Sequence, residues 1–213
     1  MKLYDFAFSP NCRKVRATAY ELGVPLESVH VDLLNGEQRT AAYLRINPNG
    51  RVPVLVDREF VLFESTAIMR YLSAKQGGAL LPTTLEGRAD VDRWMAWQLA
   101  HLGPAMGKVA FERVVKKLTR QGAPDEAAIA AGSQEFVTLS AVMDRMLEGR
   151  EYLAGTLSLA DFALASHYSL AEMCGLSLAP FPRIADWLNR MMERDSMKRA
   201  LADAHALISH HAA

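Results

Sequence analysis

A hydroxyl, a thiol and two arginines lie close together near the start of the chain. Ser9 is followed by Pro10, and Cys12, Arg13 and Arg16 come next. Serine favours the position just before a helix and proline favours the first helical position, so the pattern predicts a helix that begins at Pro10. The start of a helix carries partial positive charge and unpaired N–H groups. The pattern therefore predicts a place that binds and holds an anion.

Ser9 and Cys12 each have two interpretations. The Ser9 hydroxyl either acts on a bound anion or only caps its own helix. Cys12 lies beside Arg13 and Arg16, where a thiol can be acidic and can form a mixed disulfide with a small thiol. The alternative for Cys12 is a small, buried hydrophobic residue on the helix face that also carries Val15.

The elements around this cluster alternate between strand and helix over roughly the first 75 residues, which is typical of an α/β unit. Short apolar runs predict the strands, and apolar residues at helical spacing predict the helices. The predicted strands are 2–8, 26–34, 52–56 and 60–63, and the predicted helices are 10–22, 39–46 and one that begins at 64–66. Asn47-Pro48-Asn49-Gly50 reads as a turn between the second helix and the third strand.

The second half of the chain predicts an all-α bundle. Gly77 and Gly78, with Pro82 shortly after, mark a linker. The predicted helices are 86–117, 125–147, one from 158, one near 182 and a last one at 196–208. Ser158 and Asp161 predict a capping box at the start of the third of these helices, and a catalytic carboxylate at Asp161 is the alternative.

Composition excludes several classes of protein. The 213 residues are 50% hydrophobic, enough for one large core or two smaller ones. The 24 basic and 24 acidic residues give no net charge, which argues against a nucleic-acid binder. Two cysteines, Cys12 and Cys174, favour a reducing cytosol over a disulfide framework. Charged residues interrupt each apolar run, so we expect no membrane span or signal peptide and a soluble, intracellular protein.

Four motifs in this order resemble the cytosolic glutathione S-transferases, and the resemblance covers the whole chain. The motifs are Ser9-Pro10-Asn11-Cys12-Arg13-Lys14-Val15, Asn47 to Leu55 (NPNGRVPVL), Phe63 to Ile68 (FESTAI) and the Ser158–Asp161 capping box. The resemblance implies a thioredoxin-like, glutathione-binding domain at 1–77, a linker at 78–86 and an all-helical, electrophile-binding domain at 87–213. It also implies a homodimer in the cytoplasm.

Within this family the chain resembles the serine-type classes, which are theta, phi and related bacterial forms. These classes have a serine at the end of the first strand, where this chain has Ser9. Tyr4 lies too early, inside the strand, to match the tyrosine of the tyrosine-type classes. The cysteine-type bacterial classes place a cysteine near here, but Cys12 falls within the first helical turn.

The resemblance assigns roles to residues on both sides of the predicted turn at 47–50. Ser9 would stabilise the glutathione thiolate, and Arg13 could add positive charge. The peptide bond before Pro53 would be cis, which would leave the backbone of Val52 free to pair with the cysteinyl part of glutathione. Glu64 and Ser65 would hold the γ-glutamyl end at the start of a helix; a plain cap at Ser65 is compatible with this role.

Other residues are candidates for the glycyl carboxylate of glutathione and for the electrophile pocket. Arg51, Arg39 and Gln38 are candidates for the glycyl carboxylate, with solvated surface charge as the alternative. The resembled classes often have histidine or lysine near positions 38 and 39, where this chain has glutamine and arginine. Candidates for the electrophile pocket, with ordinary core packing as the alternative, are Phe8, Trp97, His101, Met106 and Tyr168. The tail histidines at 205, 210 and 211 lack companion ligands, so we expect no metal site.

These assignments predict an enzyme that ionises glutathione and delivers its sulfur to a hydrophobic electrophile. Two rival functions remain open at this point. One is a glutathione-dependent thiol–disulfide reductase that uses Cys12. The other is a non-catalytic module that binds glutathione or a partner. A lyase, isomerase or dehalogenase on the same scaffold is also compatible with the sequence.

Overall fold

The computed structural model describes residues 1–202 of the chain. Within these residues the contacts divide the chain into two compact units. The first contains Met1–Leu80 together with the segment that begins at Met192, and the second is Leu81–Met191. The sequence placed the segment after Met192 with the helical half. Here it belongs to the first unit, in which residues 195–202 are helical.

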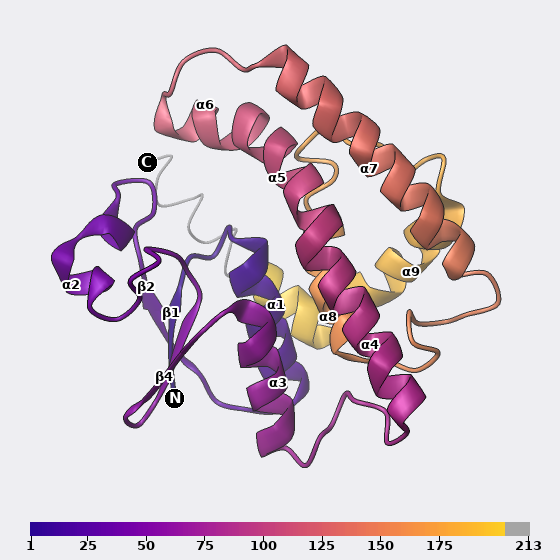
Figure 1. The fold of residues 1–213 in the computed structure, drawn as a ribbon, viewed down its shortest axis with the longest axis horizontal. Coiled ribbons are helices and arrows are strands. Elements are labelled where there is room, and N and C mark those ends of the chain that lie inside the picture. Colours follow the sequence, from indigo (N-terminus) through magenta and orange to yellow (C-terminus); the bar gives the residue numbers. More distant parts are fainter. Residues whose placement is uncertain (203–213) are drawn as a thin grey trace. The chain divides into compact units, whose positions relative to one another are not determined.

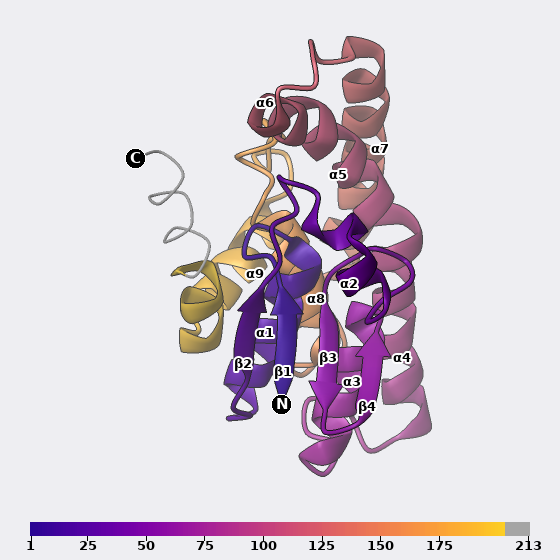
Figure 2. The ribbon, with the colours of Figure 1, turned by 90° about the vertical axis from the view of Figure 1, so that its left-hand side faces the viewer.

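The first unit is built on a mixed sheet with strand order β2-β1-β3-β4 (Figure 1). Strand β1 runs parallel to β2 and antiparallel to β3, and β3 runs antiparallel to β4. The strands are β1 at Lys2–Asp5, β2 at Glu27–His30, β3 at Val54–Asp57 and β4 at Phe60–Phe63. Figure 2 shows the arrows of β1 and β4 pointing one way and that of β3 pointing the other.

Helices cover both faces of this sheet, and the predicted thioredoxin-like order of strands and helices is confirmed. Helices α1 (Pro10–Glu21) and α3 (Ser65–Lys75) pack side by side against one face. The short 3₁₀ helix Glu37–Arg39 and helix α2 (Ala41–Leu44) lie on the other. Apolar side chains between α1, α3 and the sheet are fully buried, namely Leu3, Val15, Leu55, Ile68 and Leu72.

Three predicted strand boundaries are wrong by two or more residues, each because a local polar bond or a proline ends the strand pairing. The first strand ends at Asp5, since residues 6–9 form a turn in which Ser9 N–H donates to the Phe6 carbonyl over 2.9 Å. The second ends at His30, because the Asp32 carboxylate binds the following backbone N–H groups. The third begins at Val54 rather than at residue 52, directly after Pro53.

The second unit contains the first four helices predicted for this half of the chain, and its first helical stretch is the most irregular. That stretch runs through α4 (Leu85–Trp97), a π-helical turn (Gln98–Leu102), α5 (Gly103–Ala110), a second π-helical turn (Phe111–Val115) and α6 (Lys116–Thr119). The other helices are α7 (Glu126–Met146), α8 (Leu159–Tyr168) and α9 (Pro182–Met192). In the described part of the chain, no helix combines the length and the apolar character that crossing a bilayer requires.

The predicted capping box at the start of α8 is present. The Asp161 carboxylate is fully buried and accepts bonds from the Ser158 N–H and hydroxyl, each over 2.9 Å. It also accepts from the Leu153 N–H over 3.0 Å and from Trp187 Nε1 over 2.9 Å. Burial raises the pKa of Asp161, and these donors oppose that rise. A carboxylate so fully bonded by its own unit acts as a folding device rather than as a catalyst.

Candidate functional site

The predicted binding residues of the first unit meet at one end of its sheet. Tyr4 near the end of β1 pairs with Val54 at the start of β3, and Val54 pairs with Phe63 at the end of β4. The segments beyond these positions carry Ser9, Val52 and Glu64, which are far apart in the sequence. Antiparallel pairing therefore brings the starts of α1 and α3 and the loop before β3 to the same edge of the sheet (Figure 2).

Ser9 is the N-cap of α1, and Pro10 is the first helical residue, as predicted. The Ser9 Oγ accepts a hydrogen bond from the Cys12 N–H over 3.4 Å. A hydroxyl has two lone pairs and one proton, so accepting this bond leaves the O–H free to donate. Capping and stabilisation of a bound anion are thus compatible at the same residue.

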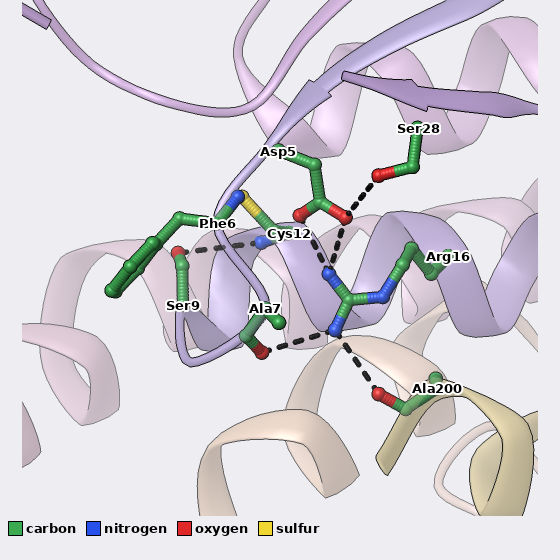
Figure 3. Close-up of polar contacts among 8 residues, drawn as sticks. All are labelled: Asp5, Phe6, Ala7, Ser9, Cys12, Arg16, Ser28 and Ala200. Atoms are coloured by element: carbon green, nitrogen blue, oxygen red, sulfur yellow. Dashed lines mark hydrogen bonds and ion pairs between the residues drawn. The ribbon is translucent and has the colours of Figure 1, made fainter. Parts of the chain in front are cut away.

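Cys12 points into the interior. Its side chain is fully buried, and its sulfur accepts a bond from the Phe6 N–H over 3.5 Å (Figure 3). Burial, reinforced by the nearby Asp5 carboxylate, raises the pKa of the thiol far above its usual value. The thiolate form that disulfide chemistry needs is therefore disfavoured. These observations support the packing interpretation of Cys12 and argue against the acidic thiol.

The loop before β3 is fixed by two side chains that the sequence prediction missed. The Arg51 carbonyl accepts bonds from the Tyr43 hydroxyl over 2.8 Å and from Asn47 Nδ2 over 2.7 Å. The Val52–Pro53 peptide bond is cis, as predicted. Within residues 1–202 the N–H and C=O of Val52 make no hydrogen bond, so both are available to a ligand. Asn47 lies in the turn predicted at residues 47–50, and this turn was the feature of the sequence from which its role could have been predicted.

Helix α3 begins at Ser65 without a side-chain cap. The preceding residue, Glu64, is exposed and has a φ of 71°, which is a strained conformation for a residue with a side chain. The Ser65 hydroxyl donates to Asn11 Oδ1 over 3.4 Å, and this bond ties the start of α3 to the first turn of α1. Asn11 was not predicted to take part. Two helix starts, each with partial positive charge, are thus held next to each other.

Lys14 is a fully buried cation on the side of α1 that faces α3. Its side chain has no exposed surface, and its Nζ lies 3.5 Å from Thr66 Oγ1. Burial lowers the pKa of Lys14 to about 7, although Glu64 and Cys12 act in the opposite direction. This burial could not be predicted, because lysine is rarely found inside proteins.

The candidates for the glycyl carboxylate lie on neighbouring segments. Arg39 and Arg51 are exposed, and Gln38 is half-buried. The two segments run close together, since a Cβ atom added at Gly50 would lie 3.1 Å from the Gln38 carbonyl oxygen. Gly50 also has a φ of 60°, which glycine adopts without strain. The structure thus places the segment that carries Gln38 and Arg39 against the turn that precedes Arg51, and both arginines are exposed to solvent.

The residues named for an electrophile pocket have very different surroundings. Phe8 is half-buried, with its ring 5.6 Å from that of Phe6. In the helical unit, His101 is exposed and Trp97 is half-buried, while Met106 and Tyr168 lie in the core. The Tyr168 hydroxyl pairs with Ser140 Oγ over 3.2 Å. The burial of Met106 and Tyr168 supports the alternative of ordinary core packing for these two residues. Positions 205, 210 and 211 lie outside the described residues.

Comparison with known proteins supplies the remaining evidence. Residues 3–79 match the family model described as "Glutathione S-transferase, N-terminal domain". Residues 103–195 match "Glutathione S-transferase, C-terminal domain". The chain belongs to the glutathione S-transferase family. The predicted family and its enzyme class, a transferase, are therefore confirmed.

Individual glutathione S-transferases resemble the chain over nearly its full length. Glutathione S-transferase 3 of Zea mays is 32% identical over 95% of this chain and 93% of the maize protein. GstB of Escherichia coli is 33% identical over 91% of this chain and 93% of the bacterial protein. A theta class enzyme from Xanthomonas axonopodis, solved with glutathione bound, has a TM-score of 0.86 and 32% identity, covering 94% of this chain and 96% of that one.

Proposed function

We propose that this glutathione S-transferase ionises the glutathione thiol beside Ser9 and transfers the sulfur to a hydrophobic electrophile. One observation carries the proposal. Ser9 Oγ lies at the start of α1, and its proton has no acceptor among residues 1–202. The same end of the sheet holds the start of α3 and the backbone of Val52, which is unpaired within those residues. A thiolate placed there would receive a hydrogen bond and the partial positive charge of the helix.

The free energy needed to ionise the glutathione thiol is similar to what Ser9 and the start of α1 can contribute. A free thiol has a pKa near 8.5 and is only a few per cent ionised at neutral pH. Lowering that pKa by ~2 units requires about 2.7 kcal/mol of preferential interaction with the thiolate. A hydrogen bond to a charged group contributes roughly 1.5–3 kcal/mol, and a helix start adds about 0.3–1 kcal/mol. The Ser9 hydroxyl and the start of α1 together can supply this difference.

The rest of glutathione would bind to backbone groups and charges around Ser9. The N–H and C=O of Val52 would pair with the cysteinyl residue as a short antiparallel strand beside Pro53. The N–H groups at the start of α3 would hold the γ-glutamyl carboxylate, and the Ser65 hydroxyl would leave Asn11 Oδ1 to donate to it. Glu64 would accept from the ammonium group. Arg51, with Arg39 as the second candidate, would bind the glycyl carboxylate.

The reaction is a nucleophilic substitution or a conjugate addition. The thiolate sulfur forms a bond to the electrophilic carbon, and the electron pair leaves with the leaving group or moves into a conjugated acceptor that is then protonated. Phe8, half-buried next to Ser9 in the sequence, is our candidate for contact with an apolar electrophile. We place the enzyme in the cytoplasm as a homodimer that binds no nucleic acid. Residues 1–77 would form the main part of the glutathione-binding domain, and the helices between residues 87 and 191 would form the electrophile-binding domain.

Steady-state kinetics with glutathione and an activated aryl halide test this proposal. Ser9→Ala should lower kcat/KM by roughly 10–100-fold at about neutral pH, since it removes one hydrogen bond to a charged sulfur. Ser9→Thr keeps a hydroxyl and a cap, so it should retain much of the activity. A Ser9→Ala variant that conjugates within about threefold of the unaltered enzyme would refute the role of Ser9.

A further inference from the structure

One buried guanidinium group joins three separate segments of the first unit. Arg16 on α1 is only 2% exposed. Its Nη1 lies 2.6 Å from both carboxylate oxygens of Asp5, the last residue of β1. Its Nη2 donates to the carbonyl oxygens of Ala7 and Ala200, each over 3.0 Å (Figure 3). The side chain therefore connects the end of the first strand, the loop after it and the C-terminal segment.

The Ala7 contact lies inside the turn that delivers Ser9. That turn runs from Phe6 to Ser9 and is closed by the bond from Ser9 N–H to the Phe6 carbonyl. Ala7 occupies its second position and is buried, so water cannot readily replace the Arg16 donor at its carbonyl. Rotation of this peptide would change the path of the chain into Ser9. Arg16 thus holds the corner of the turn on which the Ser9 hydroxyl depends.

The C-terminal segment is attached to the same helix by polar contacts. Glu21 at the end of α1 accepts from Arg194 Nε over 3.2 Å and from Ser196 Oγ over 2.6 Å. The Arg199 guanidinium lies 4.1 Å from the centre of the Tyr20 ring. These contacts keep residues 194–200 against α1, where the Ala200 carbonyl takes up one of the Arg16 donors. The orientation of the guanidinium is therefore fixed from both sides.

We propose that Arg16 is a positioning residue for catalysis. By binding the Ala7 carbonyl, it fixes the position of the Ser9 hydroxyl. The inference rests on the proposed role of Ser9. A simple ion pair with Asp5 would need only a positive charge. In the observed arrangement, the two terminal nitrogens of the planar guanidinium donate to acceptors in three segments. Lysine supplies the charge but has one nitrogen, so it cannot reach all these acceptors at once.

The test uses Arg16→Lys, with Ser28→Ala as the matched control. Ser28 donates to Asp5 over 3.1 Å but does not contact Ala7, so its loss weakens the ion pair without releasing the turn. In Arg16→Lys we expect kcat/KM for the electrophile, measured at saturating glutathione and about pH 6.5, to fall roughly fivefold, because the apparent pKa of the pH profile rises by ~1 unit. The loss should vanish above about pH 9, where the thiol ionises without help. KM for glutathione should stay within about twofold, and Ser28→Ala should keep the pH profile of the unaltered enzyme.

Repeating the substitution in Ser9→Ala separates this inference from the proposed function. With no hydroxyl to position, Arg16→Lys should cause no further shift of the pH profile. An equal shift in both backgrounds, or a folded Arg16→Lys enzyme with an unchanged profile, would overturn the inference while leaving Ser9 in its role. A Ser9→Ala enzyme with an unchanged profile would instead defeat the proposed function.

A second measurement applies whether or not the lysine variant folds. In a crystal structure of the unaltered enzyme with glutathione, Arg16 Nη2 should remain within hydrogen-bonding distance of the Ala7 carbonyl while Ser9 Oγ contacts the sulfur. A structure in which Ser9 reaches the sulfur after the Ala7 carbonyl has turned away from Arg16 would rule the positioning role out.

Discussion

The Ser9 hydroxyl and the Cys12 thiol are linked through one backbone group yet belong to different environments. Ser9 Oγ accepts from the Cys12 N–H over 3.4 Å, while the Cys12 sulfur turns inward to the Phe6 N–H over 3.5 Å. The helix start therefore leaves the Ser9 hydroxyl able to donate and buries the Cys12 thiol. This relationship favours the transferase over the reductase as the chemistry of the site.

Replacing Cys12 by alanine should leave conjugation within about threefold of the unaltered enzyme. The variant loses a small buried group and should be destabilised by roughly 1–2 kcal/mol in urea unfolding. In the folded enzyme, the thiol should react slowly with a disulfide reagent, since burial raises its pKa. Fast labelling under native conditions, or reductase turnover that Cys12→Ala abolishes, would revive the redox alternative.

Replacing Asn47 by alanine should weaken glutathione binding more than turnover. The change removes the Asn47 Nδ2 bond to the Arg51 carbonyl and loosens the loop that presents Val52. We expect KM for glutathione to rise roughly 5–20-fold, which corresponds to ~1–2 kcal/mol, with kcat reduced less. Tyr43→Phe deletes the other donor to the same carbonyl and should act in the same direction. Normal KM values in both variants would show that this loop does not bind the tripeptide.

Replacing Lys14 by methionine should make stability less dependent on pH. The pKa of Lys14 falls from 10.5 to about 7 on folding, so between these values the unfolded chain binds a proton that the folded chain does not. Stability therefore rises with pH across this window, and the buried charge costs most below about pH 7. Lys14→Met should stabilise the protein by a few kcal/mol at about pH 6.5 and by much less at about pH 10.

Urea unfolding at both pH values measures this effect. Lys75→Met is a suitable control, because Lys75 pairs with Asp57 near the surface and its substitution should change stability little at either pH. A Lys14→Met protein that is less stable at the lower pH would mean that the buried ammonium is stabilised by its surroundings.

Replacing Asp161 by alanine should unfold the protein more easily without altering the chemistry. The substitution leaves four buried donors without an acceptor, so we expect the free energy of unfolding to fall by roughly 3–5 kcal/mol. The kcat of the folded fraction at low temperature should be unchanged, and Ser158→Ala should cost less stability. A well-folded Asp161→Ala enzyme with kcat lowered a hundredfold would restore the catalytic interpretation of this carboxylate.

Local signals in the sequence were sufficient for much of the fold. Ser9 and Pro10 predict the start of α1 correctly, β4 has its predicted limits, and the Ser158–Asp161 pattern predicts the cap of α8. Each of these depends on residues a few positions apart. The strand ends at Asp5 and His30 could not be predicted, because side chains and turns beyond the apolar runs decide them.

Long-range contacts could not be predicted at all from the sequence. Ser65 meets Asn11 across 54 positions, and Arg16 meets the Ala200 carbonyl across 184. Such pairs depend on how the sheet brings helix starts and the C-terminal segment together. The cis bond at Pro53 came from the family resemblance, whereas the burial of Lys14 contradicts the usual behaviour of lysine.

Spectrophotometric titration of bound glutathione tests the central claim most directly. The absorbance of the thiolate is followed against pH in the unaltered enzyme, in Ser9→Ala and in Ser9→Thr. The bound thiol should titrate ~2 units below its free value in the unaltered enzyme, at least ~1 unit higher in Ser9→Ala, and in between for Ser9→Thr. The same titration curve in all three proteins would contradict the assignment of Ser9 as the group that ionises glutathione.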